Sequence, residues 1–167
     1  VTYQGEPHAL AVVRDITQRK ADENRLRATI EAALDSIVVM DTEDRIVEFN
    51  PAAEACFGHR RKDVLGKRLA ELIVPERFRA AHRRGMVRYL AEGQGPYIGR
   101  RVEVTAMRAD GSEFPAELAI AVTEGLAGKL FVGYTRDITE RKTAEEALRA
   151  SREQYRAIFN AAVDALV

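Results

Sequence analysis

The sequence of 167 residues has one cysteine, no tryptophan and no excess of either charge. The single Cys56 excludes an internal disulfide and a thiolate metal cluster, because both need several thiols. Lys plus Arg number 26 and Asp plus Glu number 26, so the basic excess of a nucleic-acid-binding protein is missing. No apolar run has the length of a membrane span, and no segment resembles a signal peptide. We therefore expect a cytoplasmic protein that binds neither nucleic acid nor membrane.

The sequence also lacks the motifs of the common catalytic classes. It has no P-loop, no kinase glycine pattern, no zinc-protease motif and no paired nucleophile and base. Cys56 lies in an alanine-rich stretch, where we interpret it as small core filling and not as the reactive thiol of a flavin photosensor. We expect no catalysis within these residues; the alternative, a fragment of a catalytic domain, depends on chain beyond Val167.

Residues 101–123 predict the central hairpin of an antiparallel sheet. Asp110-Gly111 separates two runs of alternating apolar residues, which indicates a tight turn, and we expect type I′ with positive φ at both residues. One apolar and one polar face are typical of a sheet that is covered on one side. The expected apolar face consists of Val102, Val104, Ala106, Phe114, Ala116, Leu118, Ile120 and Val122, with Val132 from a later strand over 129–136.

Two stretches before the hairpin predict helices. Asn50 is a favourable N-cap, Pro51 is suited to the first helical position, and Gly58 ends the helix. A longer helix opens at Pro75 and runs to about Glu92. The row of this helix expected to face the sheet is Phe78, His82, Met86 and Leu90.

Two short segments of the chain occur twice. Residues 13–20 return as 135–142, and residues 32–38 return as 161–167. The two offsets differ by seven residues, one heptad, which keeps the apolar stripe of a coiled coil in phase. An accidental difference in length gives the same offset. The repeat predicts a tandem array that contains the end of one unit, one whole unit and the start of the next.

Each repeated Asp-Ile-Thr segment precedes a helical pattern. Asp15 with Gln18, and Asp137 with Glu140, resemble capping boxes at a strand-to-helix exit. For the first helix, over 17–34, a surface helix lying on its own domain stays an alternative to a coiled coil. The second helix carries a narrow stripe typical of paired helices, made of Ala144, Leu148, Ser151, Tyr155, Ile158 and Ala162. The residues expected to couple strand to helix are Asp15, Thr17, Asp137 and Thr139.

Taken together, these segments resemble the PAS domain family. The resemblance is carried by residues 41–53, 57–58, 64–67, 108–115 and 136–141. It implies an α+β fold, with a five-stranded antiparallel sheet of strand order 2-1-5-4-3, helices on one face and coiled-coil signalling helices at the flanks. The organisation it implies is the end of a preceding PAS unit over 1–16, a signalling helix over 17–34, a PAS domain over 35–138, a second signalling helix over 139–160 and the start of the next unit over 161–167.

The family also implies a role. PAS domains are sensory or relay modules of bacterial signalling proteins, often histidine kinases or diguanylate cyclases. From this resemblance we expect a parallel homodimer through the flanking helices, with neighbouring PAS and effector domains in the same chain. A shift in the sheet would then reach the paired helices at its exit.

A narrower resemblance, to FixL-type haem oxygen sensors, concerns a ligand. Residues 75–82, 97–99 and 108–111 carry it, and they make His82 a candidate axial ligand of haem iron. Leu118 and Ile120 fall on strand positions that line the distal side of the haem in that group.

Two positions depart from the FixL-type pattern. At equal spacing, Val102 stands where that group has the arginine that binds oxygen. The neighbouring Arg101 cannot take its place, because one residue along a strand points to the opposite face. Arg83 follows His82 where an acidic residue is usual. The alternatives are a histidine that hydrogen-bonds a carbonyl or carboxylate, and a core closed by its own side chains or holding a dry apolar pocket.

Overall fold

The computed structural model describes residues 2–3, 6–7, 17–125 and 128–164. The chain divides into two compact units, Val1–Ala32 and Ala33–Val167. In the first unit, strands β1 (Thr2–Tyr3) and β2 (Glu6–Pro7) pair antiparallel, and helix α1 spans Thr17–Glu31. Residues 8–16, which belong to the expected end of a preceding unit and include the expected capping residue Asp15, lie outside the described residues.

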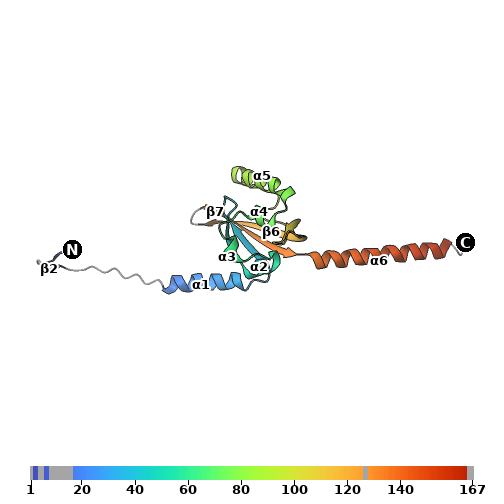
Figure 1. Cartoon of the computed structure of the whole chain (residues 1–167), viewed down its shortest axis with the longest axis horizontal. Coiled ribbons are helices and arrows are strands. Elements are labelled where there is room, and N and C mark those ends of the chain that lie inside the picture. Colours follow the sequence, from blue (N-terminus) through green and yellow to red (C-terminus); the bar gives the residue numbers. More distant parts are fainter. Residues whose placement is uncertain (1, 4–5, 8–16, 126–127, 165–167) are drawn as a thin grey trace. The chain divides into compact units, whose positions relative to one another are not determined.

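The second unit has a sheet with helices inserted between its strands (Figure 1). The strands are β3 (Ser36–Met40), β4 (Ile46–Phe49), β5 (Arg101–Met107), β6 (Glu113–Gly125) and β7 (Gly128–Asp137). The helices are α2 (Pro51–Phe57), α3 (Arg61–Val64), α4 (Leu69–Ile73), α5 (Glu76–Glu92) and α6 (Thr139–Asp164).

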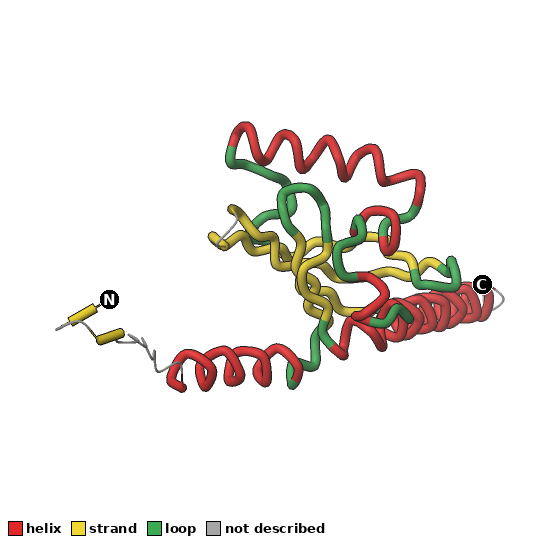
Figure 2. The backbone as a smooth tube through the Cα atoms, turned by 60° about the vertical axis from the view of Figure 1, so that its left-hand side comes forward, coloured by secondary structure: helices red, strands yellow, loops and turns green. Residues whose placement is uncertain are grey.

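The strand order of this sheet is β4-β3-β7-β6-β5, with every neighbouring pair antiparallel. Numbered along the unit, this is 2-1-5-4-3, so the expected topology is confirmed. The first strand lies beside the last: Val38 of β3 pairs with Phe49 on one side and with Gly133 on the other. Figure 2 shows the resulting twisted sheet with α5 on one side of it.

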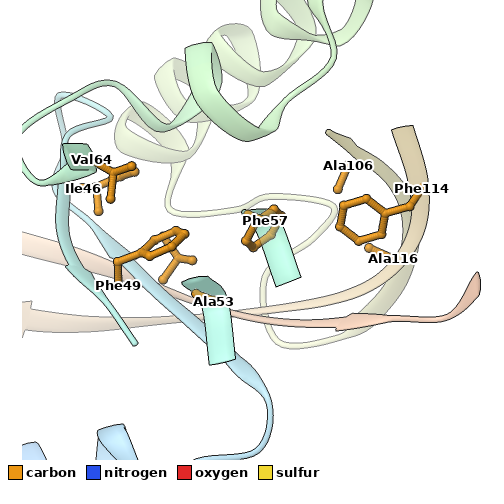
Figure 3. Close-up of a cluster of buried hydrophobic side chains, with 9 residues drawn as sticks. Ile46, Phe49, Ala53, Phe57, Val64, Ala106, Phe114 and Ala116 are labelled. Atoms are coloured by element: carbon orange, nitrogen blue, oxygen red, sulfur yellow. The ribbon is translucent and has the colours of Figure 1, made fainter. Parts of the chain in front are cut away.

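The hydrophobic core lies between α2 and one face of the sheet (Figure 3). The ring of Phe57 is fully buried and lies between Phe49 and Phe114, at centroid distances of 6.0 and 5.8 Å. Such ring contacts add to the free energy of apolar burial. The buried members of this cluster are Val38, Ile46, Phe49, Ala53, Phe57, Val64, Ala106, Phe114 and Ala116.

The start of α2 follows the sequence prediction. The side-chain oxygen of Asn50 accepts a hydrogen bond from Ala53 N at 2.9 Å, which caps the helix, and Gly58 ends it with φ 74°. The same oxygen accepts from Ile37 N at 2.8 Å, and the amide nitrogen donates to Asp35 O at 3.1 Å. Asn50 therefore joins α2 to the start of the central strand β3.

The β5–β6 hairpin is confirmed, but the predicted type I′ turn is wrong. Among the described residues only Asp44 and six glycines have positive φ, so Asp110 does not adopt that conformation, whereas Gly111 does, with φ 84°. Gly111 N donates to Arg108 O, and the Asp110 carboxylate accepts from Ser112 N at 2.8 Å. This local side-chain bond stabilises a longer connection than a two-residue turn.

The expected apolar face is also correct except at one strand. Phe131 is 2% exposed and pairs with Met40 and Val122, whereas Val132 pairs with Val39 and Ala121 on the opposite face. Placing Val132 inside was therefore wrong by one residue, and such a shift exchanges the two faces of a strand.

Candidate functional site

The junction between β7 and α6 is held by the carboxylate of Asp137. One oxygen accepts hydrogen bonds from Thr139 N at 2.8 Å and from the Thr139 hydroxyl at 2.6 Å. Burial raises the pKa of Asp137, but the bonds from Thr139 and the neighbouring Arg108 outweigh it, so the pKa lies below its ordinary value. Helix α6 begins at Thr139, two residues after Asp137. The predicted capping box pairs Asp137 with Glu140, whereas the carboxylate accepts hydrogen bonds from Thr139.

Arg108 connects this junction to the rest of the domain. Its guanidinium donates to the second carboxylate oxygen of Asp137 and to the carbonyl oxygen of Cys56 in α2. The guanidinium also lies 3.9 Å from the ring centroid of Phe114 in β6. One side chain therefore touches α2, β6 and the start of the exit helix. Arg108 was not among the site residues expected from the sequence, although it precedes the Asp-Gly turn.

The first turns of α6 make further ion pairs with the polar face of the sheet. Lys142 and Arg141 reach Glu103 of β5 at 2.5 and 2.9 Å. Arg141 also lies 3.8 Å from Glu117 of β6. These pairs are exposed, so each stabilises the contact weakly, but they connect both strands of the hairpin to the helix.

A second candidate site lies along α5. The face of α5 that is partly buried contains His82, Gly85, Met86 and Tyr89, and Tyr89 packs edge-on against Phe131 of the sheet at 5.3 Å. The predicted row was wrong at both ends, because Phe78 and Leu90 are each 42% exposed. A spacing of four advances about 40° beyond a full turn at each step, so such a row winds off one face.

Open space adjoins this inner face of α5. A Cβ atom added to Gly85 would meet nothing within 4 Å, although Gly85 is on the same face as Tyr89. On the sheet, Leu118 and Ile120 share the face of the core residue Ala116 but are only half-buried. We call this region, made of the inner face of α5 and these two strand residues, the α5 region.

His82 points one ring nitrogen at a carboxylate. Its Nδ1 lies 3.9 Å from Oδ1 of Asp44, in the β3–β4 connection, and the side chains are 23% and 12% exposed. Burial lowers the pKa of His82 and raises that of Asp44, while the mutual attraction of the pair acts against both shifts. The alternative interpretation from the sequence, a histidine beside a carboxylate, therefore agrees with the geometry, and Asp44 was not among the expected site residues.

Val102 and Arg101, at the position that departs from the FixL-type pattern, lie on opposite faces of the sheet. Val102 pairs with Leu118 and shares its face, where it supplies no polar group. Arg101 lies on the opposite face, as expected, and its guanidinium bonds Glu117 at 3.1 Å. The face of β5 that Val102 shares with Leu118 therefore holds no arginine.

Other features of the described residues bear on partners. Along α6, Leu148, Tyr155 and Ile158 are 55%, 75% and 60% exposed, so the predicted stripe lies uncovered on the single chain. Within the described ranges no helix combines the length and the apolar character needed to cross a bilayer. In the same ranges no three His, Cys, Asp or Glu side chains gather in a way that could hold a metal ion.

Comparison with known proteins agrees with this architecture. A protein of Azorhizobium caulinodans is 42% identical over 82% of the chain, and the sensor protein FixL of Bradyrhizobium diazoefficiens is 28% identical over 85%. The chain spans only 19% and 29% of these two proteins. Two further curated relatives are the sensor histidine kinase TmoS of Ectopseudomonas mendocina, 29% identical, and the cell-division control histidine kinase PdhS of Brucella ovis, 30% identical.

Solved structures and a family model lead to the same assignment. The PAS domain of an HTR-like protein from Haloarcula marismortui superposes with a TM-score of 0.57 at 26% identity, covering 72% of this chain and 95% of that one. The PAS domain model matches residues 34–140. The chain therefore belongs to the PAS domain family, and this segment is a regulatory sensory module.

Proposed function

We propose that this PAS domain is a relay in a multidomain cytoplasmic signalling protein, such as a histidine kinase or a diguanylate cyclase. One observation carries the proposal: Arg108 and Asp137 join α2, the hairpin and the first turn of α6. A change in the sheet or in α2 would alter the guanidinium position and so the start of the helix. Helix starts held by a few bonds are suited to switching between two arrangements.

The test of this relay is Asp137→Ala in the complete signalling protein. The variant should fold, because Asp137 is at the surface, but its output should no longer respond to the input. Hydrogen exchange should also become faster in the first turn of α6, where Thr139 loses its acceptor. Arg149→Ala is the matched control, since Arg149 pairs only with Glu153 on the same helix among the ion pairs of the described residues. Normal signalling by Asp137→Ala would overturn the relay.

The same proposal includes a parallel homodimer through the flanking helices, with PAS and effector domains as neighbours in the chain. The exposed stripe of α6 supports it, because a helix with a narrow apolar stripe is stabilised by pairing. Ile158→Glu should convert the dimer to a monomer in light scattering, whereas Glu146→Ala on another face should not. Tyr155→Cys in a Cys56→Ser background should cross-link to itself, as a parallel pair requires. A wild-type monomer would contradict this part.

A second candidate function is a haem-binding gas sensor with His82 as the axial ligand. The open space beside Gly85 and the half-buried Leu118 and Ile120 favour it. When bound, haem would supply an iron for a diatomic gas. Reconstitution with hemin should give a Soret band that His82→Ala abolishes. A wild-type sample without a Soret band would remove this candidate and leave the relay intact.

A further inference from the structure

The backbone at Asp44 is unusual. Asp44 has φ 67°, the one non-glycine residue with positive φ among those described. This conformation is free of strain for glycine but strains the backbone of other residues. The chain therefore has a carboxylate at a position where the backbone favours glycine, and a strained residue of this kind indicates a role for its side chain.

The carboxylate is used at one oxygen only. Oδ2 accepts a hydrogen bond from Ala70 N at 3.1 Å, and the backbone oxygen of Asp44 accepts from Leu69 N at 2.8 Å. Both bonds hold the start of α4 to the β3–β4 connection. Oδ1 is buried and has no hydrogen-bond partner. It faces His82, whose Nδ1 is likewise buried without a partner.

Two buried polar atoms that face each other without other partners can form a hydrogen bond with each other. A buried polar atom left unpaired destabilises the fold, and a small side-chain rotation from 3.9 Å would make a direct hydrogen bond between the two. The other charged groups nearby are Arg68 and Glu71, which face Asp44, and Arg83 beside His82. Among the hydrogen bonds of the described residues, none joins Nδ1 of His82 to these arginines or to Glu71.

We propose that Asp44 is a positioning residue that fixes the tautomer and ring orientation of His82, so that Nε2 of His82 offers a ligand one nitrogen lone pair. When Nδ1 donates its proton to Asp44, Nε2 must be the acceptor, and it points away from the carboxylate. The ligand class is then an electron-pair acceptor: a metal centre such as a porphyrin iron, or a molecule with an N–H or O–H donor. The proposal rests on the ligand-binding role proposed for His82, but its first test needs no ligand.

The test is the tautomer of His82, read from ¹⁵N shifts of its ring nitrogens at a pH where the ring is neutral. The wild type should show Nδ1–H with a free Nε2. Asp44→Asn should reverse this, because the amide oxygen is held by Ala70 N and its NH₂ group then faces Nδ1. Asp44→Gly, which suits the backbone, should return the ring to the Nε2–H form that a free imidazole favours. Glu43→Gln, an exposed neighbour in the same connection, should change nothing.

An Nε2–H tautomer in the wild type, or the same tautomer in folded Asp44→Asn, would overturn the proposal. Because Asp44→Gly and Asp44→Asn both tolerate positive φ, at least one should stay folded. Two probes then identify the acceptor class. Hemin should bind about 10–100-fold more weakly to Asp44→Asn than to the wild type if iron is the acceptor. Indole should shift the Nε2 resonance if an N–H donor is bound. A wild-type protein that binds neither probe would contradict the ligand part, while the tautomer still decides the role of Asp44.

Discussion

The replacement Asn50→Ala should destabilise the domain strongly for the loss of a single polar side chain. Asn50 is 1% exposed, and its oxygen is the acceptor for the backbone N–H groups of Ile37 and Ala53. Alanine leaves both buried donors unpaired, at about 1–3 kcal/mol each, and removes the cap of α2. We therefore expect a loss of about 3 kcal/mol, a large part of the ~5–15 kcal/mol that stabilises a typical domain.

Urea unfolding followed by circular dichroism measures this loss. The midpoint should fall at an unchanged slope, and the melting temperature should fall by more than about 10 °C. Asn50→Ser is the matched control, because serine is a favourable N-cap that can retain the bond from Ala53 N but is too short to accept from Ile37 N as well. If Asn50→Ala loses less than about 1 kcal/mol, or no more than Asn50→Ser, the two backbone bonds do not have the role assigned to them.

Three further predictions concern stability. The folded pKa of Asp137 lies below its ordinary value, so its carboxylate stabilises the wild type relative to Asp137→Asn. This difference in stability should be complete above the unfolded carboxyl pKa and should vanish as the pH falls through the folded pKa. Urea titrations across acidic pH would measure it. Phe57→Ala should lose about 3–5 kcal/mol in urea unfolding, whereas Val87→Ala, at a 68% exposed position, should lose less than about 0.5 kcal/mol. Gly111→Ala should destabilise by about 1 kcal/mol through its positive φ, while Gly85→Ala in α5 should stabilise by about as much; equal signs in thermal melts would refute the backbone argument.

Local rules were enough for the elements whose signals lie close together in the chain. The cap at Asn50, the end of α2 at Gly58 and the alternation along β5 and β6 all depend on residues a few positions apart. The same holds for the opposite orientations of Arg101 and Val102, since successive strand residues face opposite sides. The resemblance to PAS domains then supplied the strand order, which no local signal contains.

Errors arose where a contact competes with a local preference. Asp110-Gly111 favours a type I′ turn, but the bond from Ser112 to the Asp110 carboxylate stabilises a longer connection. Along α5, each successive pair of residues from Phe78 to Leu90 has helical spacing, so the predicted inner row included both ends. Over several turns a spacing of four rotates away from one face, which leaves Phe78 and Leu90 exposed. The tandem repeat and the heptad offset stay predictions.

The sequence by itself determined the secondary structure, the apolar face of the hairpin and the strand-to-helix exit at Asp137, because these follow from the backbone preferences and periodicity of neighbouring residues. Only the tertiary structure showed that Arg108 joins Cys56 to Asp137 and that Asp44 faces His82. Arg108 is 52 positions from Cys56 and 29 from Asp137, and Asp44 is 38 positions from His82, so no short-range pattern relates these partners. They meet because the sheet places its first strand beside its last and brings α5 back over the β3–β4 connection.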